Sequence, residues 1–309
     1  MAESSSKKGL VGKVAVVTGA GRGIGRAEPI LLAREGAKVV VNDLGCDVYG
    51  KGADSSVAQS VVDEIRKEGS EAVANSDNVA TMKGGARITA TALEAFGRLD
   101  ILINNAGIVR PREIYEMSEE EWDSVIAVHL KGHFTTIRHA APIFREQRSG
   151  AIVNTASESG LGHYGMGNYS AAKEGIVGLT RTTARELGQY GVRCNAIRPR
   201  AQTRMRIPEI VELLRISEEK LGIPALGNRW SFDIADVRPT EHVVAFAVWL
   251  CTDAAAQVNG RTFQVGGGEI ELYSEPEGWN LDTLDTPAIR TYLIGALRNS
   301  FLPLQVSRR

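Results

Sequence analysis

Short apolar runs rich in β-branched residues alternate with longer segments of mixed polarity along most of this chain. The apolar runs occupy residues 13–19, 38–43, 71–77, 99–107, 150–157, 192–199 and 261–267. Between them, helices are predicted over residues 56–68, 85–96, 119–145, 169–190 and 240–251. Strands that are buried on both faces are continuously apolar, and helices supply the crossovers between parallel strands. The pattern therefore predicts an α/β protein with a doubly wound parallel sheet.

Three stretches depart from this alternation. Residues 45–54 form a Gly-containing insert after the second apolar run, and residues 200–230 form a connection long enough to be a lid or substrate loop. Residues 270–309 form a C-terminal extension, predicted to close over a substrate pocket, in which Thr286 and Pro287 are a suitable start for a helix. Nothing interrupts the alternation earlier, so residues 1–269 are predicted to be a single domain.

The charges are nearly balanced, with 36 Lys and Arg residues against 37 Asp and Glu residues. This balance favours neither a nucleic-acid partner nor a membrane surface, and no apolar run reaches the length of about 18–20 residues that spans a bilayer. Cys46, Cys194 and Cys251 form no CxxC pair, which argues against disulfides or structural zinc. The first residues lack the apolar segment of a signal peptide. Together these features predict a cytoplasmic protein.

The first apolar run ends in the sequence TGAGRGIG, residues 18–25, where a helix is predicted to begin. Glycines at positions 19, 23 and 25 let the backbone turn sharply and approach a diphosphate, whose charge the helix N-terminus stabilises. The candidate contacts in this loop are Gly19, Arg22, Gly23, Ile24 and Gly25. A preceding strand and a following helix are the context in which this pattern marks a dinucleotide site, so the sequence predicts a Rossmann fold.

Asp43 ends the second apolar run, eighteen residues after Gly25. A carboxylate at this point can accept hydrogen bonds from the adenosine ribose and would repel a 2′-phosphate, so NAD is expected rather than NADP. Arg22 favours the opposite choice, because a guanidinium can hold a phosphate. We give more weight to Asp43, since its charge would be close to the phosphate whereas Arg22 can turn into solvent.

Tyr169 and Lys173 lie four residues apart in a predicted helix of small residues, within the sequence NYSAAK. At this spacing the two side chains share one face of the helix, one turn apart. The pair alone is equally compatible with a packed phenol beside a solvated ammonium and with a proton donor whose pKa the ammonium lowers.

Four features in the right order resemble the motifs of short-chain dehydrogenases/reductases: the glycine loop, NNAG at residues 104–107, Ser157, and the YxxxK pair. The resemblance covers about the first two hundred residues. It implies that Tyr169 exchanges a proton with the substrate oxygen, that Lys173 lowers the pKa of Tyr169 and binds the nicotinamide ribose, and that Ser157 stabilises the substrate oxygen. Ser159 is a nearby alternative, but Ser157 begins the SxxG pattern that is typical of the family.

The same resemblance implies further cofactor contacts at the ends of predicted strands. These are Asn78 and Val79 beside the adenine, Asn105, Ala106 and Gly107 beside the ribose, and Pro199 and Thr203 beside the carboxamide. Asp77 is an alternative to Asn78.

A narrower resemblance is to the (3R)-hydroxyacyl-CoA dehydrogenase part of peroxisomal multifunctional enzymes of type 2. It is carried by VVVNDLG with the following insert, VHLKGHF, TASESG, RPRAQTRM, and VWLC before NGRTFQVGGG. It implies NAD-dependent oxidation of a secondary alcohol, or the reverse, on a small molecule of the hydroxyacyl-CoA or hydroxysteroid type, by a homodimer or homotetramer. A 3-oxoacyl-[acyl-carrier-protein] reductase and a catalytically silent nucleotide-binding module are alternatives.

His129 departs from the family pattern, because many members have an Asn at this position that seats a water for proton relay. We interpret His129 as a tolerated variant if the relay uses the helix backbone carbonyl. His133 lies four residues further on, but no third ligand is suggested, so no metal site is expected.

Arg200 follows Pro199 at the end of the sixth predicted strand, where members of the family usually have a Gly. Four arginines crowd this loop: Arg198, Arg200, Arg204 and Arg206. They are equally compatible with contacts to the phosphates of a CoA thioester and with a solvated basic lid.

Overall fold

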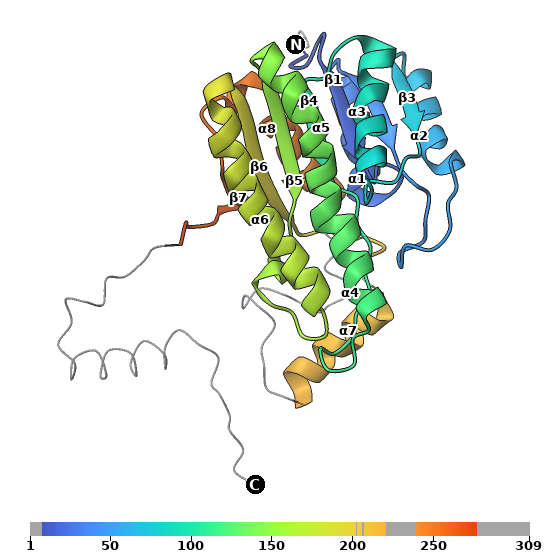
Figure 1. Cartoon of the computed structure of the whole chain (residues 1–309), viewed down its shortest axis with the longest axis vertical. Coiled ribbons are helices and arrows are strands. Elements are labelled where there is room, and N and C mark those ends of the chain that lie inside the picture. Colours follow the sequence, from blue (N-terminus) through green and yellow to red (C-terminus); the bar gives the residue numbers. More distant parts are fainter. Residues whose placement is uncertain (1–7, 202, 206, 221–238, 277–309) are drawn as a thin grey trace, which may run out of the picture.

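All seven predicted strands are present in the computed structural model, which describes residues 8–201, 203–205, 207–220 and 239–276. They belong to one eight-stranded sheet with the order β3-β2-β1-β4-β5-β6-β7-β8 (Figure 1). The strands are β1 (Val14–Thr18), β2 (Lys38–Asn42), β3 (Ala72–Asn75), β4 (Ile101–Asn104), β5 (Gly150–Thr155), β6 (Val192–Pro199), β7 (Thr262–Gly266) and β8 (Glu269–Leu272). Strands β1 to β7 pair in parallel, which confirms the predicted doubly wound sheet.

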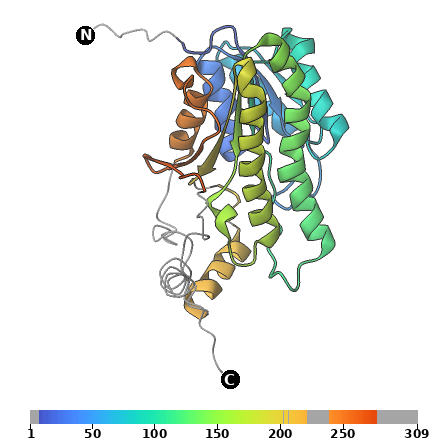
Figure 2. The ribbon, with the colours of Figure 1, turned by 60° about the vertical axis from the view of Figure 1, so that its left-hand side comes forward.

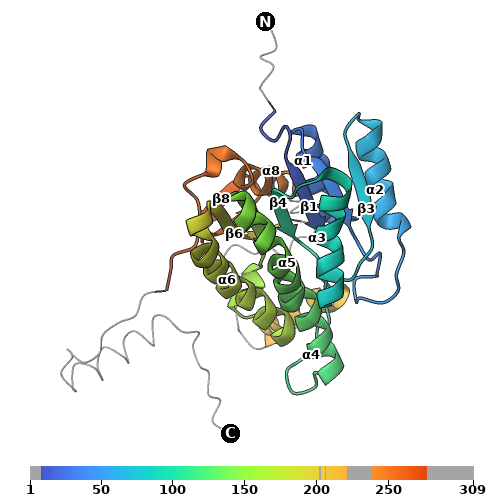
Figure 3. The same cartoon turned by 45° about the horizontal axis from the view of Figure 1, so that its top comes forward.

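Two layers of helices cover the sheet, one on each face (Figure 3). One layer contains α1 (Gly23–Arg34), α2 (Ser56–Lys67) and α8 (Thr240–Leu250), and the other contains α3 (Met82–Phe96), α5 (Gly132–Gln147) and α6 (Gly167–Leu187). Successive strand residues face opposite layers: Ala15 and Val17 pack toward the first, Val14 and Val16 toward the second. This double burial is why the strands are continuously apolar. None of the described helices is both long and apolar enough to cross a membrane.

The predicted helix over residues 119–145 is continuous but contains an irregularity. It consists of α4 (Glu119–Ile126), a π-helical turn (Ala127–Lys131) and α5. A capping box of Ser118 and Glu121 starts it, since each side chain hydrogen-bonds the backbone of the other residue. The π-helical turn is common at functional sites, and here it carries His129.

The sheet extends further than the sequence predicted. Gly267 and Gly268, with φ angles of 61° and 83°, reverse the chain so that β8 pairs antiparallel to β7. The predicted boundary between residues 269 and 270 therefore falls inside β8. The rest of the predicted extension, from residue 277 and including Thr286 and Pro287, lies outside the described residues.

The carboxyl ends of the parallel strands meet at one edge of the sheet, where ligands bind in folds of this kind. Beyond this edge lies α7 (Pro208–Arg215), which belongs to the predicted substrate loop (Figures 1 and 2). Residues 221–238 of that loop are outside the described part of the chain.

Glu28 in α1 is an unusual buried charge. Its side chain is completely buried, and neither carboxylate oxygen has a hydrogen-bond partner among the described residues. Burial raises the pKa of Glu28 from its ordinary value of 4.5 to about 8. Between these two pH values the folded chain holds a proton that the unfolded chain releases, so the free energy of unfolding falls as the pH rises from 4.5 to about 8.

We expect Glu28→Met to stabilise the fold at pH 8 by about 1–3 kcal/mol, because it replaces an unpaired buried carboxyl with an apolar side chain of similar length. Thermal unfolding measured from pH 5 to pH 8 should also show a weaker pH dependence than in the wild type. Glu186→Met, at an exposed position of α6, is the control and should change neither quantity. A lower melting temperature of Glu28→Met at pH 8 would contradict this account.

Candidate active site

A cleft of about 500 Å³ opens at the carboxyl edge of the sheet. Every residue that the sequence predicts for the site lines it: Gly19, Arg22, Gly23, Ile24, Gly25, Asp43, Asn78, Val79, Asn105, Ala106, Gly107, Ser157, Tyr169, Lys173, Pro199 and Thr203. Asp77 and Ser159, the two alternatives, line it as well. The structure therefore brings the predicted residues together, while their contacts with a cofactor and substrate stay predictions.

The glycine loop presents bare backbone to the cleft. Gly19 and Gly23 have φ angles of 62° and 56°, which side-chain-bearing residues rarely adopt. A Cβ atom on Gly25 would lie 2.1 Å from the carbonyl oxygen of Gly19, so no side chain fits there. Asn105 fixes the loop by donating hydrogen bonds to the carbonyl oxygens of Thr18 (3.2 Å) and Gly19 (3.1 Å). A loop of this shape at the start of α1 fits the diphosphate of a dinucleotide.

Asp43 is buried, and its carboxylate binds the backbone of the glycine loop and of the insert. Its Oδ2 accepts from the backbone N–H of Gly21 at 2.8 Å, and its Oδ1 accepts from that of Gly45 at 2.7 Å. Each carboxylate oxygen can accept a further hydrogen bond, so these contacts leave capacity for ribose hydroxyls. Asp43 thus also connects the glycine loop to the insert.

The sequence analysis allowed Arg22 to turn into solvent, but in the structure its side chain is held at the insert. Its Nη1 donates to the carbonyl oxygen of Cys46 in the insert at 3.0 Å. Arg204 donates to the same oxygen at 3.2 Å. The two guanidinium groups thus meet at the insert, in the wall of the cleft.

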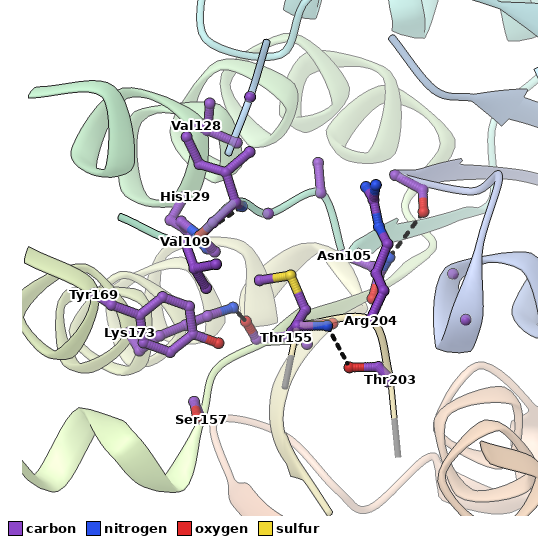
Figure 4. A pocket seen from close by; sticks show the side chains of 18 of the residues that line it. Asn105, Val109, Val128, His129, Thr155, Ser157, Tyr169, Lys173, Thr203 and Arg204 are labelled. Carbon is purple, nitrogen blue, oxygen red and sulfur yellow. Dashed lines mark hydrogen bonds between the residues drawn. The ribbon is translucent and has the colours of Figure 1, made fainter. Parts of the chain in front are cut away.

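Tyr169 and Lys173 share one face of α6, as their spacing predicted (Figure 4). The Nζ atom of Lys173 lies 5.4 Å from the centre of the Tyr169 ring and donates to the carbonyl oxygen of Thr155 at 2.5 Å. Ser157 follows β5, and its hydroxyl is close enough to Tyr169 to oppose part of the rise in the pKa of the phenol (Figure 4). The Oγ atom of Ser157 accepts from the backbone N–H of Ser159 at 3.1 Å. These three groups form a compact donor and acceptor set at the floor of the cleft.

The pKa of Tyr169 is not lowered, although the sequence analysis expected Lys173 to lower it. Burial raises the pKa of Tyr169 to about 12, and the Ser157 hydroxyl only partly opposes this. Burial also lowers the pKa of Lys173 to about 7. Desolvation is the largest cause of both shifts, and it favours the neutral form of each group.

His129 is a buried, packed residue of the π-helical turn. Its Nε2 hydrogen-bonds the backbone of Ile108, and its ring meets the Tyr169 ring edge-on with centres 5.0 Å apart. The backbone carbonyl oxygen of His129, which a proton relay would use, is hydrogen-bonded to Nδ1 of His133 at 2.7 Å. Burial lowers the pKa of both imidazoles, that of His133 to about 3, so both are neutral at pH 7. Over the described residues there is no cluster of three potential metal ligands.

Residues 13–209 match the family model of short chain dehydrogenases. The chain belongs to this family. A crystal structure of a short chain dehydrogenase from Mycobacterium avium has 43% identity and a TM-score of 0.76, and the match covers 96% of this chain and 98% of that chain. The predicted family and fold are thereby confirmed.

Two curated relatives are similar over most of this chain. Hydroxyacyl-CoA dehydrogenase ChsB1 of Mycobacterium tuberculosis is 40% identical over an alignment of 310 positions, which covers 93% of this chain and 90% of that protein. Peroxisomal multifunctional enzyme type 2 of Mus musculus is 41% identical over 260 residues, or 84% of this chain, but only 32% of the mouse protein is covered. This chain therefore spans about a third of the mouse protein. Its family and relatives make it an oxidoreductase that acts on a CH–OH group with a nicotinamide cofactor.

In this short-chain dehydrogenase, Arg198 and Arg200 are buried and ion-paired, so they are not part of a solvated basic lid. Arg198 is 2% exposed and pairs with Glu174, and Arg200 is 8% exposed and pairs with Glu158. The alternative of a solvated lid is therefore wrong for these two, and of the two only Arg200 lines the cleft. Arg204 is exposed at the cleft, whereas Arg206 lies outside the described residues.

The sequence analysis missed an apolar chamber beside Tyr169. It is the part of the cleft that is lined by the clustered apolar side chains of Tyr49, Val109, Met166, Met205, Ile210 and Leu214. Tyr49 belongs to the insert, and its hydroxyl donates to Glu209 of α7 at 3.0 Å. The insert was noticed in the sequence, but its contact with a residue 160 positions away left no local signal.

We expect Gly25→Ala to weaken NADH binding at least tenfold, because the new Cβ would clash with the Gly19 carbonyl oxygen and force the two ends of the glycine loop apart. A fluorescence titration with NADH measures the dissociation constant. Gly178→Ala is the matched control, since a Cβ at that α6 position meets nothing within 4 Å, and it should bind NADH like the wild type. Equal affinities of the two variants would show that the cofactor does not approach this loop.

Proposed function

We propose that this chain oxidises the secondary alcohol of a hydroxyacyl-CoA-type substrate with NAD, or catalyses the reverse reduction. The observation that carries the proposal is the meeting of Ser157, Tyr169 and Lys173 in one cleft with the glycine loop, next to an apolar chamber. The relatives named as hydroxyacyl-CoA dehydrogenase and multifunctional enzyme support the substrate class.

Each side chain has a distinct role in this reaction. The nicotinamide, when bound, accepts or gives the hydride. Tyr169 removes the hydroxyl proton of the alcohol during oxidation and returns it during reduction. Ser157 donates a hydrogen bond to the same oxygen and stabilises the negative charge that develops there.

Proton transfer by Tyr169 near pH 7 needs a pKa far below 12. For each unit by which this pKa falls, the phenolate must be stabilised relative to the phenol by about 1.4 kcal/mol. A bound oxidised nicotinamide would supply a positive charge in the desolvated cleft, and Lys173 would hold the ribose hydroxyls, which would stabilise its ammonium form. Thr155 already supplies one hydrogen-bond partner of this ammonium group, so Lys173 is positioned to add the second positive charge.

The chamber and its rim support an acyl-CoA more than a small alcohol. The buried side chains beside Tyr169 offer an apolar surface for an acyl chain or a steroid ring system. Arg204 is exposed at the cleft and can contact a phosphate of the CoA moiety. A hydroxyacyl-CoA uses both features, whereas a hydroxysteroid uses only the first.

Assembly and location also stay proposals. We propose a homodimer or homotetramer in which α4, α5 and α6 pair with those of a second copy. Trp122 of α4 and Phe134 of α5 support this, since they are 38% and 44% exposed and offer apolar surface. A cytoplasmic location stays a prediction from the sequence.

Replacing Tyr169 by Phe should lower kcat for alcohol oxidation by about 10²–10⁴-fold, because its hydroxyl is the group positioned to take the proton. Ser157→Ala should lower kcat by about 10²–10³-fold through loss of the oxygen's hydrogen bond. A coupled assay of NAD reduction over 3-hydroxyacyl-CoA and hydroxysteroid substrates measures both.

Wild-type rates should rise with pH, as the phenolate forms. NADH binding without turnover on any alcohol would instead favour a nucleotide-binding module.

Asp43→Asn should reduce the preference for NAD over NADP at least tenfold, since it removes the charge that repels a 2′-phosphate at nearly constant volume. The ratio of kcat/KM for the two cofactors measures the preference. Asp47→Asn is the control, because Asp47 lies in the insert that follows Asp43 and its carboxylate accepts from the backbone N–H groups of Tyr49 and Lys51; it should leave the ratio unchanged. A wild-type ratio that favours NADP would refute the role given to Asp43.

A further inference from the structure

The loop that carries Ser157 begins where the backbone hydrogen bonds of the β-sheet end. The last residue pair of β5 and β6 is Thr155 with Ile197, and the last hydrogen bond is from the N–H of Ala156 to the carbonyl oxygen of Ile197 at 2.8 Å. Ser157 is the next residue. Its position must therefore be fixed by contacts other than the sheet.

Arg198 provides one of these contacts. Its Nη1 donates to the carbonyl oxygen of Ser157 at 2.5 Å, and its Nη2 donates to Glu174 at 2.8 Å. Glu174 follows Lys173 in α6. A single buried guanidinium thus joins the backbone of Ser157 to the helix that bears Tyr169 and Lys173.

Arg200 provides a second contact, through the residue after Ser157. Its Nη2 and Nε atoms donate to the two carboxylate oxygens of Glu158 at 2.6 and 3.0 Å. Both side chains are less than 9% exposed, and the paired geometry fixes direction as well as distance. The backbone of Arg200 is held in turn by Val265 of β7, at 2.8 Å.

Gln264 of β7 and Tyr273, which follows β8, pack against the two arginines. Gln264 pairs with Arg198 in the sheet register and is 3% exposed. In the orientation that satisfies its amide, its oxygen accepts from Arg200, and its nitrogen donates to Glu158 and to the Tyr273 hydroxyl. The Tyr273 ring covers the guanidinium carbon of Arg198 at 4.6 Å.

We propose that Glu158 and Arg198 are positioning residues that hold the Ser157 hydroxyl in reach of Tyr169 and the substrate oxygen, with Arg200 and Gln264 as their supports. The inference rests on the proposed function of Ser157. Neither Glu158 nor Arg198 lines the cleft, so both act through the serine. A buried ion pair is on average a poor source of stability compared with apolar residues of similar size, whereas a fixed geometry beside a reacting group requires it.

The test is a double-mutant cycle of Glu158→Gln with Ser157→Ala. Glu158→Gln keeps the volume and removes the charge, and should lower kcat about tenfold with KM for NAD and for the alcohol changed less than about twofold. In the Ser157→Ala background the same change should alter kcat less than about twofold, because the hydroxyl through which it acts is gone. Glu68→Gln is the matched control: Glu68 forms the same paired contact with Arg34, but on exposed helices.

Two results of the cycle overturn the inference. One is an unchanged kcat in Glu158→Gln, and the other is an equal loss of kcat in both backgrounds. Should Glu158→Gln fail to fold, Glu158→Met with Arg200→Met removes both charges, and we expect its melting temperature to be close to that of the wild type. The same cycle then applies, and wild-type kcat in that double variant would also overturn the inference.

A crystal structure of Glu158→Gln gives a readout that does not depend on turnover. The Ser157 hydroxyl should leave its position beside Tyr169 and the backbone N–H of Ser159. An unmoved hydroxyl would overturn the inference whether or not the chain oxidises an alcohol. The proposed function fails separately, if the wild type reduces NAD with none of the alcohols tested.

Discussion

The constraint on which the site depends is the end of the main-chain hydrogen-bond ladder at the carboxyl edge of the sheet. Past this edge the strands separate, and their carbonyl oxygens need other donors. Side chains supply these donors, with Asn105 on Thr18 and Gly19, Lys173 on Thr155, and Arg198 on Ser157. The residues assigned to cofactor binding and catalysis are therefore also the ones that complete the fold.

Burial sets the electrostatic character of the cleft. Tyr169 and Lys173 are both pushed toward their neutral forms, and His129 and His133 beside them are neutral too. A desolvated floor with little net charge responds strongly to any charge that enters, since the effective dielectric constant is low. This sensitivity is what couples the oxidised nicotinamide to proton transfer in the proposed reaction.

Local patterns in the sequence were sufficient for the strands, the glycine loop and the Tyr169–Lys173 pair. Each depends on residues that are close in sequence, such as a buried strand followed by glycines or two side chains one helical turn apart. The strand β8 was missed because its residues are mostly exposed, so it has no apolar run to reveal it. The same limit applies to Glu158 and Arg200, 42 positions apart, whose pairing depends on the β5–β6 register. The pKa of Tyr169 was also beyond reach, since it depends on how deeply the finished fold buries α6.

The hydrogen bond between Tyr49 and Glu209 holds one wall of the cleft less firmly than the floor is held. It is exposed to water, which competes for both partners, so this bond adds little net stability and is easily broken. The floor beneath it is fixed by buried contacts such as those of Lys173 and Arg198, which are far harder to open. A bulky molecule can thus push the insert and α7 apart as it enters or leaves, without disturbing the atoms among which the hydrogens are exchanged.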